Sequence, residues 1–289
     1  SVGGAGTATE GFGKRFFNLN MITTKNTDHL QRVNTCFLLD KNVQNFDLQN
    51  CKANPQKHKK ILLIGDSHSA SLYPGLRDYL AAENIETVMM TAAFCLPLVE
   101  TFPGPHNKAA NKRCETINNQ VVSAIQSSEY DLIVLSAYMH QWGFTHDWSW
   151  SYPRYYDDFL AQLHTLAQKH PFLVVGQFPI WPHGLEQVFY KEAIDFNIKR
   201  VENFQKHSTN GLDLTIFETE KKYAEDTKNL GAKYVSVLDK LCNEQGCARY
   251  ISTDNGIKLI TFDYGHLGFE ASKYIAGKVV GPEIVKAIK

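Results

Sequence analysis

Short apolar runs alternate with segments of helical periodicity along most of the chain. The runs favour buried strands, and the segments between them place apolar residues three or four positions apart, which favours helices. The strands predicted in this way cover 60–64, 87–91, 131–136, 172–176 and 234–238. The predicted helices cover 72–83, 116–127, 155–169, 187–206 and 219–229, and a last one begins near residue 267.

This order of elements indicates an α/β fold. Strands that alternate with helices build βαβ units, so we expect a three-layer α/β/α sandwich with a mainly parallel sheet and right-handed crossovers. In such sheets the functional site lies at the carboxyl ends of the strands.

Residues 1–59 lack this periodicity and are rich in Asn, Lys and Gln. We interpret them as a linker or extension packed on a main domain that covers residues 60–289. The glycine-rich start, residues 1–6, is typical of a flexible linker, so we expect an excised domain. The chain has no signal-peptide pattern and no apolar run near the roughly 20 residues that span a bilayer.

The composition narrows the class of partner. The chain has 289 residues, 43% of them hydrophobic, and a formal net charge of zero. This length suffices for one large domain with an extension. The neutral charge gives no reason to expect nucleic acid or an anionic membrane as a partner.

Six cysteines form three close pairs along the sequence. Without Cys-x-x-Cys spacing or a histidine cluster, we expect no metal site. Six cysteines allow fifteen connectivities. We favour nearest-neighbour disulfides in an oxidising compartment, and six buried thiols in a cytosolic protein remain the alternative. The favoured pairs are Cys36–Cys51, Cys95–Cys114 and Cys242–Cys247.

The main chemical signal is a serine on the turn after the first predicted core strand. Ser67 follows Gly65 and Asp66 there, and Asp263 and His266 stand three residues apart near the C-terminus. A serine hydroxyl needs a neighbouring base, so we predict Ser67 as nucleophile, His266 as base and Asp263 as the group that orients it. An ordinary turn serine and helix-capping or surface roles for Asp263 and His266 are the alternatives.

Three neighbours of Ser67 have simpler predicted roles. Gly65 permits a sharp turn after the strand. Asp66 is expected to bond turn amides. His68 either contacts the site or lies in solvent.

These motifs resemble the SGNH (GDSL-type) hydrolase superfamily. The run 63–70, followed by Leu72 and Pro74, is most similar to the extracytoplasmic SGNH domain fused to acyltransferase-3 membrane proteins. The Cys95–Leu98 segment and the Cys242/Cys247 pair resemble the same subgroup. The resemblance covers about residues 60–280 and implies an SGNH, flavodoxin-like sandwich.

The resemblance implies an O-acetyltransferase that acts on bacterial surface polysaccharides. Acetyl groups would come from acetyl-CoA through a membrane domain of the same full-length chain, with no cofactor bound here. The domain would face the periplasm, and an O-antigen or lipopolysaccharide-type glycan would be the acceptor. A carbohydrate acetylesterase and a non-catalytic glycan-binding domain are the alternatives.

The chain departs from the superfamily in its oxyanion hole. The Ser67 N–H implies one donor, but Ala93 stands near the expected Gly and no Asn follows the third predicted strand. We therefore name His140 and Gln141 as substitute donors. Trp142 belongs to an aromatic segment, 138–152, that either lines a sugar groove or packs on the core.

Overall fold

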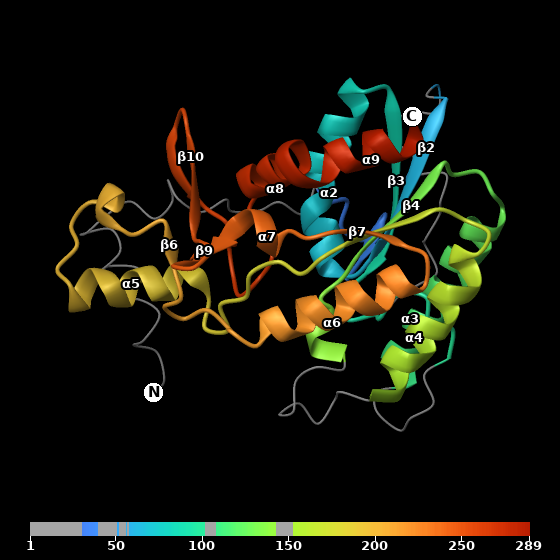
Figure 1. Cartoon of the computed structure of the whole chain (residues 1–289), viewed down its shortest axis with the longest axis horizontal. Coiled ribbons are helices and arrows are strands. Elements are labelled where there is room, and N and C mark those ends of the chain that lie inside the picture. Colours follow the sequence, from blue (N-terminus) through green and yellow to red (C-terminus); the bar gives the residue numbers. More distant parts are fainter. Residues whose placement is uncertain (1–30, 40–50, 52–55, 57, 102–107, 143–152) are drawn as a thin grey trace.

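A parallel six-stranded sheet forms the centre of the computed structural model, which describes residues 31–39, 51, 56, 58–101, 108–142 and 153–289 (Figure 1). Its strand order is β1-β3-β2-β4-β5-β7, and all neighbours are parallel. These strands are β1 (Phe37–Leu38), β2 (Lys59–Gly65), β3 (Ile85–Ala92), β4 (Leu132–Ser136), β5 (Phe172–Val175) and β7 (Lys233–Val235).

Helices cover both faces of this sheet. The α-helices of the described residues are α2 (Ser67–Ala82), α3 (Lys108–Gln126), α4 (Pro153–Ala167), α5 (Leu185–Asp195), α6 (Ile216–Asn229), α7 (Leu238–Leu241), α8 (Phe269–Ile275) and α9 (Gly281–Ile288). Shorter helical turns are η4 (Met139–Trp142), η5 (Val201–Asn203) and the π-helical η6 (Ala276–Val280).

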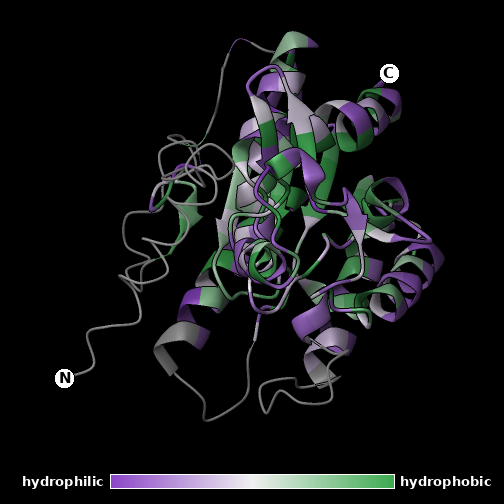
Figure 2. Ribbon diagram, turned by 90° about the vertical axis from the view of Figure 1, so that its left-hand side faces the viewer, coloured by the Kyte–Doolittle hydropathy of each residue, from purple (hydrophilic) through white to green (hydrophobic). Residues whose placement is uncertain are grey.

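Alternation along the strands divides the core into two layers. Ile61 and Leu63 of β2 face a cluster that includes residues of α2, α8 and α9. Leu62 and Ile64 face the opposite cluster, with residues of α3, α4 and α6. Successive strand side chains point to opposite faces, so strands buried on both sides read as continuous apolar runs. Figure 2 shows hydrophobic residues concentrated in the strands between the helices. The predicted three-layer sandwich is confirmed.

The carboxyl end of β2 is a topological switch point. The chain passes from β2 through α2 to β3 on one side, and β4 then pairs with β2 on the other side. Ligand sites of open α/β sheets lie outside the carboxyl ends of the strands at such a point. Ser67, the first residue of α2, lies there.

A smaller lobe with its own core lies at one end of the molecule, at the left of Figure 1. It contains α5, a three-stranded sheet in the order β6-β9-β8 and the antiparallel pair β10–β11. Its strands are β6 (His207–Ser208), β8 (Cys242–Asn243), β9 (Gly246–Ala248), β10 (Tyr250–Thr253) and β11 (Gly256–Leu259). The pattern analysis did not identify this lobe.

The described residues contain three disulfides, each between cysteines that are neighbours in the sequence. Such bonds form and persist in oxidising compartments, which indicates an extracytoplasmic location. The bonds join Cys36 to Cys51, Cys95 to Cys114 and Cys242 to Cys247.

Two predicted elements were drawn too long. The helix predicted over 187–206 ends at Asp195, because Asn197 has a left-handed φ of 50° and Ile198 donates to the carbonyl of Ala193. Apolar spacing continues beyond it since Phe204 packs on Phe189, with ring centroids 4.5 Å apart. A turn and a loop thus preserve a helix-like pattern.

The strand predicted over 234–238 ends at Val235, and α7 begins at Leu238. Val237 and Leu238 are buried, so their apolar character reflects the core and not a strand. The helix predicted from residue 72 begins five residues earlier, at Ser67.

Part of the predicted extension joins the main sheet. Phe37 and Leu38 pair in parallel with Thr91 and Ala92 of β3, so β1 is an edge strand. The boundary proposed at residue 59 remains a prediction.

Candidate active site

The turn that carries Ser67 is held by a close approach between two strands. A Cβ on Gly65 would lie 1.7 Å from the carbonyl oxygen of Ser136 in β4, so only glycine fits there. Asp66 caps α2, because its carboxylate accepts from the N–H of His68 at 2.9 Å. The nucleophile candidate is therefore fixed at the first position of a 16-residue helix.

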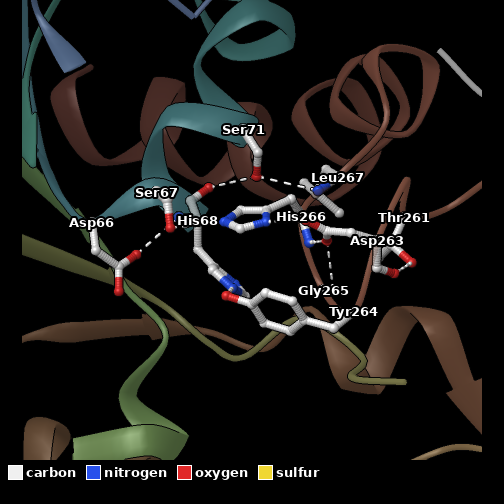
Figure 3. A network of polar contacts seen from close by, with 10 residues as sticks. All are labelled: Asp66, Ser67, His68, Ser71, Thr261, Asp263, Tyr264, Gly265, His266 and Leu267. Carbon is white, nitrogen blue, oxygen red and sulfur yellow. Dashed lines mark hydrogen bonds and ion pairs between the residues drawn. The ribbon is translucent and has the colours of Figure 1, made fainter. Parts of the chain in front are cut away.

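Ser67, His266 and Asp263 form a continuous hydrogen-bonded chain (Figure 3). His266 Nε2 lies 2.7 Å from Ser67 Oγ, and His266 Nδ1 lies 2.6 Å from Asp263 Oδ2. A carboxylate only accepts, so Nδ1 carries the proton and Nε2 is free to accept from the serine hydroxyl. This is the arrangement in which an imidazole can take the proton of a serine nucleophile.

Asp263 also shapes the loop that holds His266. Its Oδ1 accepts from the backbone N–H of Gly265 at 3.0 Å and of His266 at 2.8 Å. Burial by itself would raise the pKa of Asp263, but the hydrogen bond and positive charge of His266 and these amides hold it below its usual value. The carboxylate therefore stays ionised opposite the imidazole.

Asp66 joins the nucleophile turn to the end of β4. Its Oδ2 accepts from the N–H of Tyr138 at 2.9 Å, while Oδ1 is occupied by His68. Asp66 is 1% exposed. Burial raises its pKa from 3.8 to about 6, and the two amide bonds oppose this shift. The expectation that Asp66 bonds turn amides describes this geometry.

His68 lies beneath the site and not in solvent. Its ring stacks on Tyr138, with centroids 4.7 Å apart and planes 8° apart, and its Nε2 lies 3.4 Å from the Tyr264 hydroxyl. Its centroid is 4.9 Å from that of His266. Burial and the nearby charge of His266 hold the pKa of His68 well below its usual value, so the ring is neutral.

Ala93 is excluded as an oxyanion donor by the edge strand. Its N–H donates to the carbonyl of Leu38 at 2.9 Å, so it has no free donor for a substrate oxygen. This corrects the expectation placed on Ala93, and the reason is that β1 had not been recognised as a partner of β3. The backbone N–H of Ser67 remains the predicted donor at the helix start.

His140 is also committed elsewhere. Its Nε2 contacts Asp213 Oδ2 at 3.1 Å and its Nδ1 contacts Thr219 Oγ1 at 2.5 Å. Because the carboxylate takes the ring N–H, no ring donor remains for an oxyanion, which corrects the prediction for His140. Burial lowers the pKa of His140 against the opposing effect of Asp213.

Gln141 and Trp142 follow His140 in η4. The N–H of Gln141 donates to the carbonyl of Tyr138 at 3.4 Å, and its side chain stays an untested candidate. Trp142 packs against a core cluster with its Nε1 buried, which agrees with the alternative of core packing. The rest of the aromatic segment, 143–152, lies outside the described residues.

The pattern analysis missed several groups that surround the triad. Tyr138 and Tyr264 line His68, Phe262 stacks on His266 with centroids 5.7 Å apart, and Ser71 bonds the backbone after His266. The one signal was Ser71 itself, four residues after Ser67 within the matched motif.

Two searches of the described residues found nothing. No group of three or more His, Cys, Asp or Glu side chains there could hold a metal ion. Within the same residues, no helix combines the length and apolar character that crossing a membrane requires.

A parallel sheet with Ser67 after its central strand and an Asp–His pair on the last loop defines the SGNH hydrolase class of fold. A family model described as "SGNH domain (fused to AT3 domains)" matches residues 35–280. The chain therefore belongs to this family. Among curated proteins, none shows significant sequence similarity to it.

Solved structures share the fold. The periplasmic domain of a lipopolysaccharide acetyltransferase from Salmonella ser. Paratyphi A is 20% identical, with a TM-score of 0.70, and the match covers 89% of this chain and 94% of that one. A putative acylhydrolase from Bacteroides fragilis is 11% identical over 86% and 98% of the two chains, with a TM-score of 0.47. A GDSL-like lipase from Bacteroides thetaiotaomicron is 10% identical over 81% and 91%, with a TM-score of 0.44.

Proposed function

We propose that this chain is the O-acetyltransferase domain of a bacterial surface-polysaccharide acetyltransferase. The observation that carries the proposal is the chain of contacts from Ser67 through His266 to Asp263, at 2.7 and 2.6 Å. Membership of a family whose SGNH domains are fused to AT3 domains supports transfer of acyl groups, and the fold of the Salmonella domain is consistent with it.

The proposed reaction has two halves. His266 Nε2 takes the proton of Ser67 as Oγ attacks the acetyl carbonyl carbon, and the donor oxygen or sulfur leaves with that proton, giving acetyl-Ser67. His266 then takes the proton of a glycan hydroxyl, whose oxygen attacks the acetyl carbon. The bond to Ser67 breaks and the serine recovers its proton.

The donor and acceptor follow from the family. An acyltransferase-3 membrane domain of the same full-length chain would relay acetyl groups from acetyl-CoA to the extracytoplasmic side, and this domain would pass them on. An O-antigen or lipopolysaccharide-type glycan is the favoured acceptor. The three disulfides support an extracytoplasmic place for this step.

The test begins with intact-mass analysis after treatment with a serine-directed fluorophosphonate. We expect one adduct on the parent protein and none on Ser67→Ala or His266→Ala. Acetyl transfer from an activated acetyl ester to oligosaccharides is then compared with release to water. Transfer supports the proposal, whereas hydrolysis alone identifies a carbohydrate acetylesterase. No adduct on folded protein identifies a glycan-binding domain.

A further inference from the structure

One buried hydroxyl joins the helix of the nucleophile to the loop of the base. Ser71 Oγ donates to the carbonyl of His68 at 2.8 Å and accepts from the N–H of Leu267 at 3.2 Å (Figure 3). Both Ser71 and Leu267 are 1% exposed, so water does not compete for these bonds.

The position of each partner is informative. Ser71 lies four residues after Ser67 in α2, so it stands about one turn further along the same face. Leu267 directly follows His266. Because the Ser71 proton is used by His68, its oxygen is left to accept from Leu267, and the direction of the bond is fixed.

The base loop has its own internal bonds and can shift as a unit. Asp263 binds the side chain and the backbone of His266, and neither contact involves α2. Ser272 makes a second link to α2, since its hydroxyl donates to the carbonyl of Leu72 and accepts from the N–H of Gly75. Apart from the Ser67–His266 contact, Ser71 provides the printed hydrogen bond to α2 nearest the reacting atoms.

We propose that Ser71 is a positioning residue that sets the separation of Ser67 Oγ and His266 Nε2. The proposal deepens the proposed function and rests on it. Without the hydroxyl, the buried Leu267 N–H loses its partner, and the loop moves while the His266–Asp263 pair stays intact. A displacement of about 1 Å between reacting groups lowers a rate by as much as about 100-fold.

The kinetic test compares Ser71→Ala with Ser69→Ala. Ser69 is a matched control, because it is buried in the same helix and its hydroxyl donates to the carbonyl of Ile64, away from the base loop. With an activated acetyl ester, we expect Ser71→Ala to lower kcat by about 10- to 100-fold with KM within about twofold of the parent. Ser69→Ala should keep kcat within about threefold. Equal effects of the two changes overturn the proposal.

A second measurement does not depend on turnover. The ¹⁵N chemical shift of His266 Nε2 reports its hydrogen bond with Ser67, so Ser67→Ala should change this shift in the parent. In the Ser71→Ala background the same change should be largely lost, while the Nδ1 signal facing Asp263 remains. An unchanged response overturns the inference even in a domain without acetyl transfer, and absent turnover with the expected NMR response overturns the proposed function alone.

A substitute variant covers a failure of Ser71→Ala to fold. Ser71→Cys keeps a side chain of similar size, and its thiol is a weaker donor and acceptor than the hydroxyl. We expect a smaller fall in kcat and a partial loss of the NMR response. Parent-like values for both measurements overturn the proposal.

Discussion

Ser67 Oγ and His266 Nε2 lie 2.7 Å apart although 199 positions separate the two residues in the sequence. Packing of α2 against α8 brings them together. A Cβ on Gly75 would lie 2.3 Å from the backbone of Ser272, so the helices meet at a point that only glycine allows. The geometry of the site thus depends on how the two ends of the main domain pack.

Replacement of Asp263 by Asn should nearly abolish acetyl transfer. An Asn amide can donate to His266 Nδ1, which places the imidazole proton on Nε2 and removes the acceptor for the Ser67 hydroxyl. We expect kcat to fall by about 10³- to 10⁴-fold, as for triads in general. Steady-state kinetics with an activated acetyl ester measure this. Asp254→Asn, on the exposed turn between β10 and β11, is the control, and a loss below tenfold for Asp263→Asn would contradict the assigned role.

Asp66 should make the stability of the fold depend on pH. The folded-state pKa is raised from 3.8 to about 6, so the folded protein keeps a proton that the unfolded chain has lost. This stabilisation is complete below about pH 4 and is lost as the pH rises through about 6. A shift of this size corresponds to about 3 kcal/mol.

Asp66→Asn removes this titration. The free energy of unfolding of the parent minus that of Asp66→Asn should therefore fall by up to about 3 kcal/mol between pH 4 and pH 7. Denaturant titrations at several pH values measure the difference. A difference that is constant with pH, or that increases, would show that Asp66 is not protonated in the folded state below pH 6.

The sequence predicted those parts of the site whose signal is local. The apolar run of β2 and the residues Gly65, Asp66 and Ser67 after it are consecutive, and Asp263 and His266 share one loop. The fold class followed because buried parallel strands read as continuous apolar runs. Pairing of Ser67 with His266 came from a known chain order and not from periodicity.

The oxyanion donors could not be predicted, since they depend on contacts between distant segments. Whether the Ala93 N–H is free depends on Leu38, and whether His140 is free depends on Asp213, 73 residues away. Periodicity records burial and not partners, so a turn with buried Phe204 was predicted as helix. The same limit concealed the bond between Ser71 and Leu267.

A methyl group at Gly265 should disturb the floor of the site. A Cβ there would lie 2.5 Å from Ile180 Cδ1 and 3.1 Å from His68 Cε1, so both side chains must move. We expect Gly265→Ala to lower the free energy of unfolding by about 1–3 kcal/mol and to lower kcat as well. Thermal unfolding and ester kinetics measure the two effects.

Gly277→Ala is the matched control, because its nearest neighbour would be Tyr79 at an ordinary 3.8 Å. It should leave both quantities near the parent values. Parent-like kinetics in Gly265→Ala would mean that His68 tolerates displacement and does not support the site.

The smaller lobe should depend on a buried ion pair. Arg249 is 1% exposed; its guanidinium contacts Glu192 at 2.7 Å and lies over the Phe189 ring, 4.8 Å from the centroid. Glu192→Gln leaves the guanidinium buried without a counter-charge, so we expect a loss of about 3–5 kcal/mol in the free energy of unfolding. Glu202→Gln is the control. Its pairing with Arg200 is 3.7 Å long and solvent-exposed, so its removal should change that free energy by less than about 1 kcal/mol. Denaturant unfolding at neutral pH compares the two variants, and equal effects would mean that the Glu192 pair does not hold the lobe together.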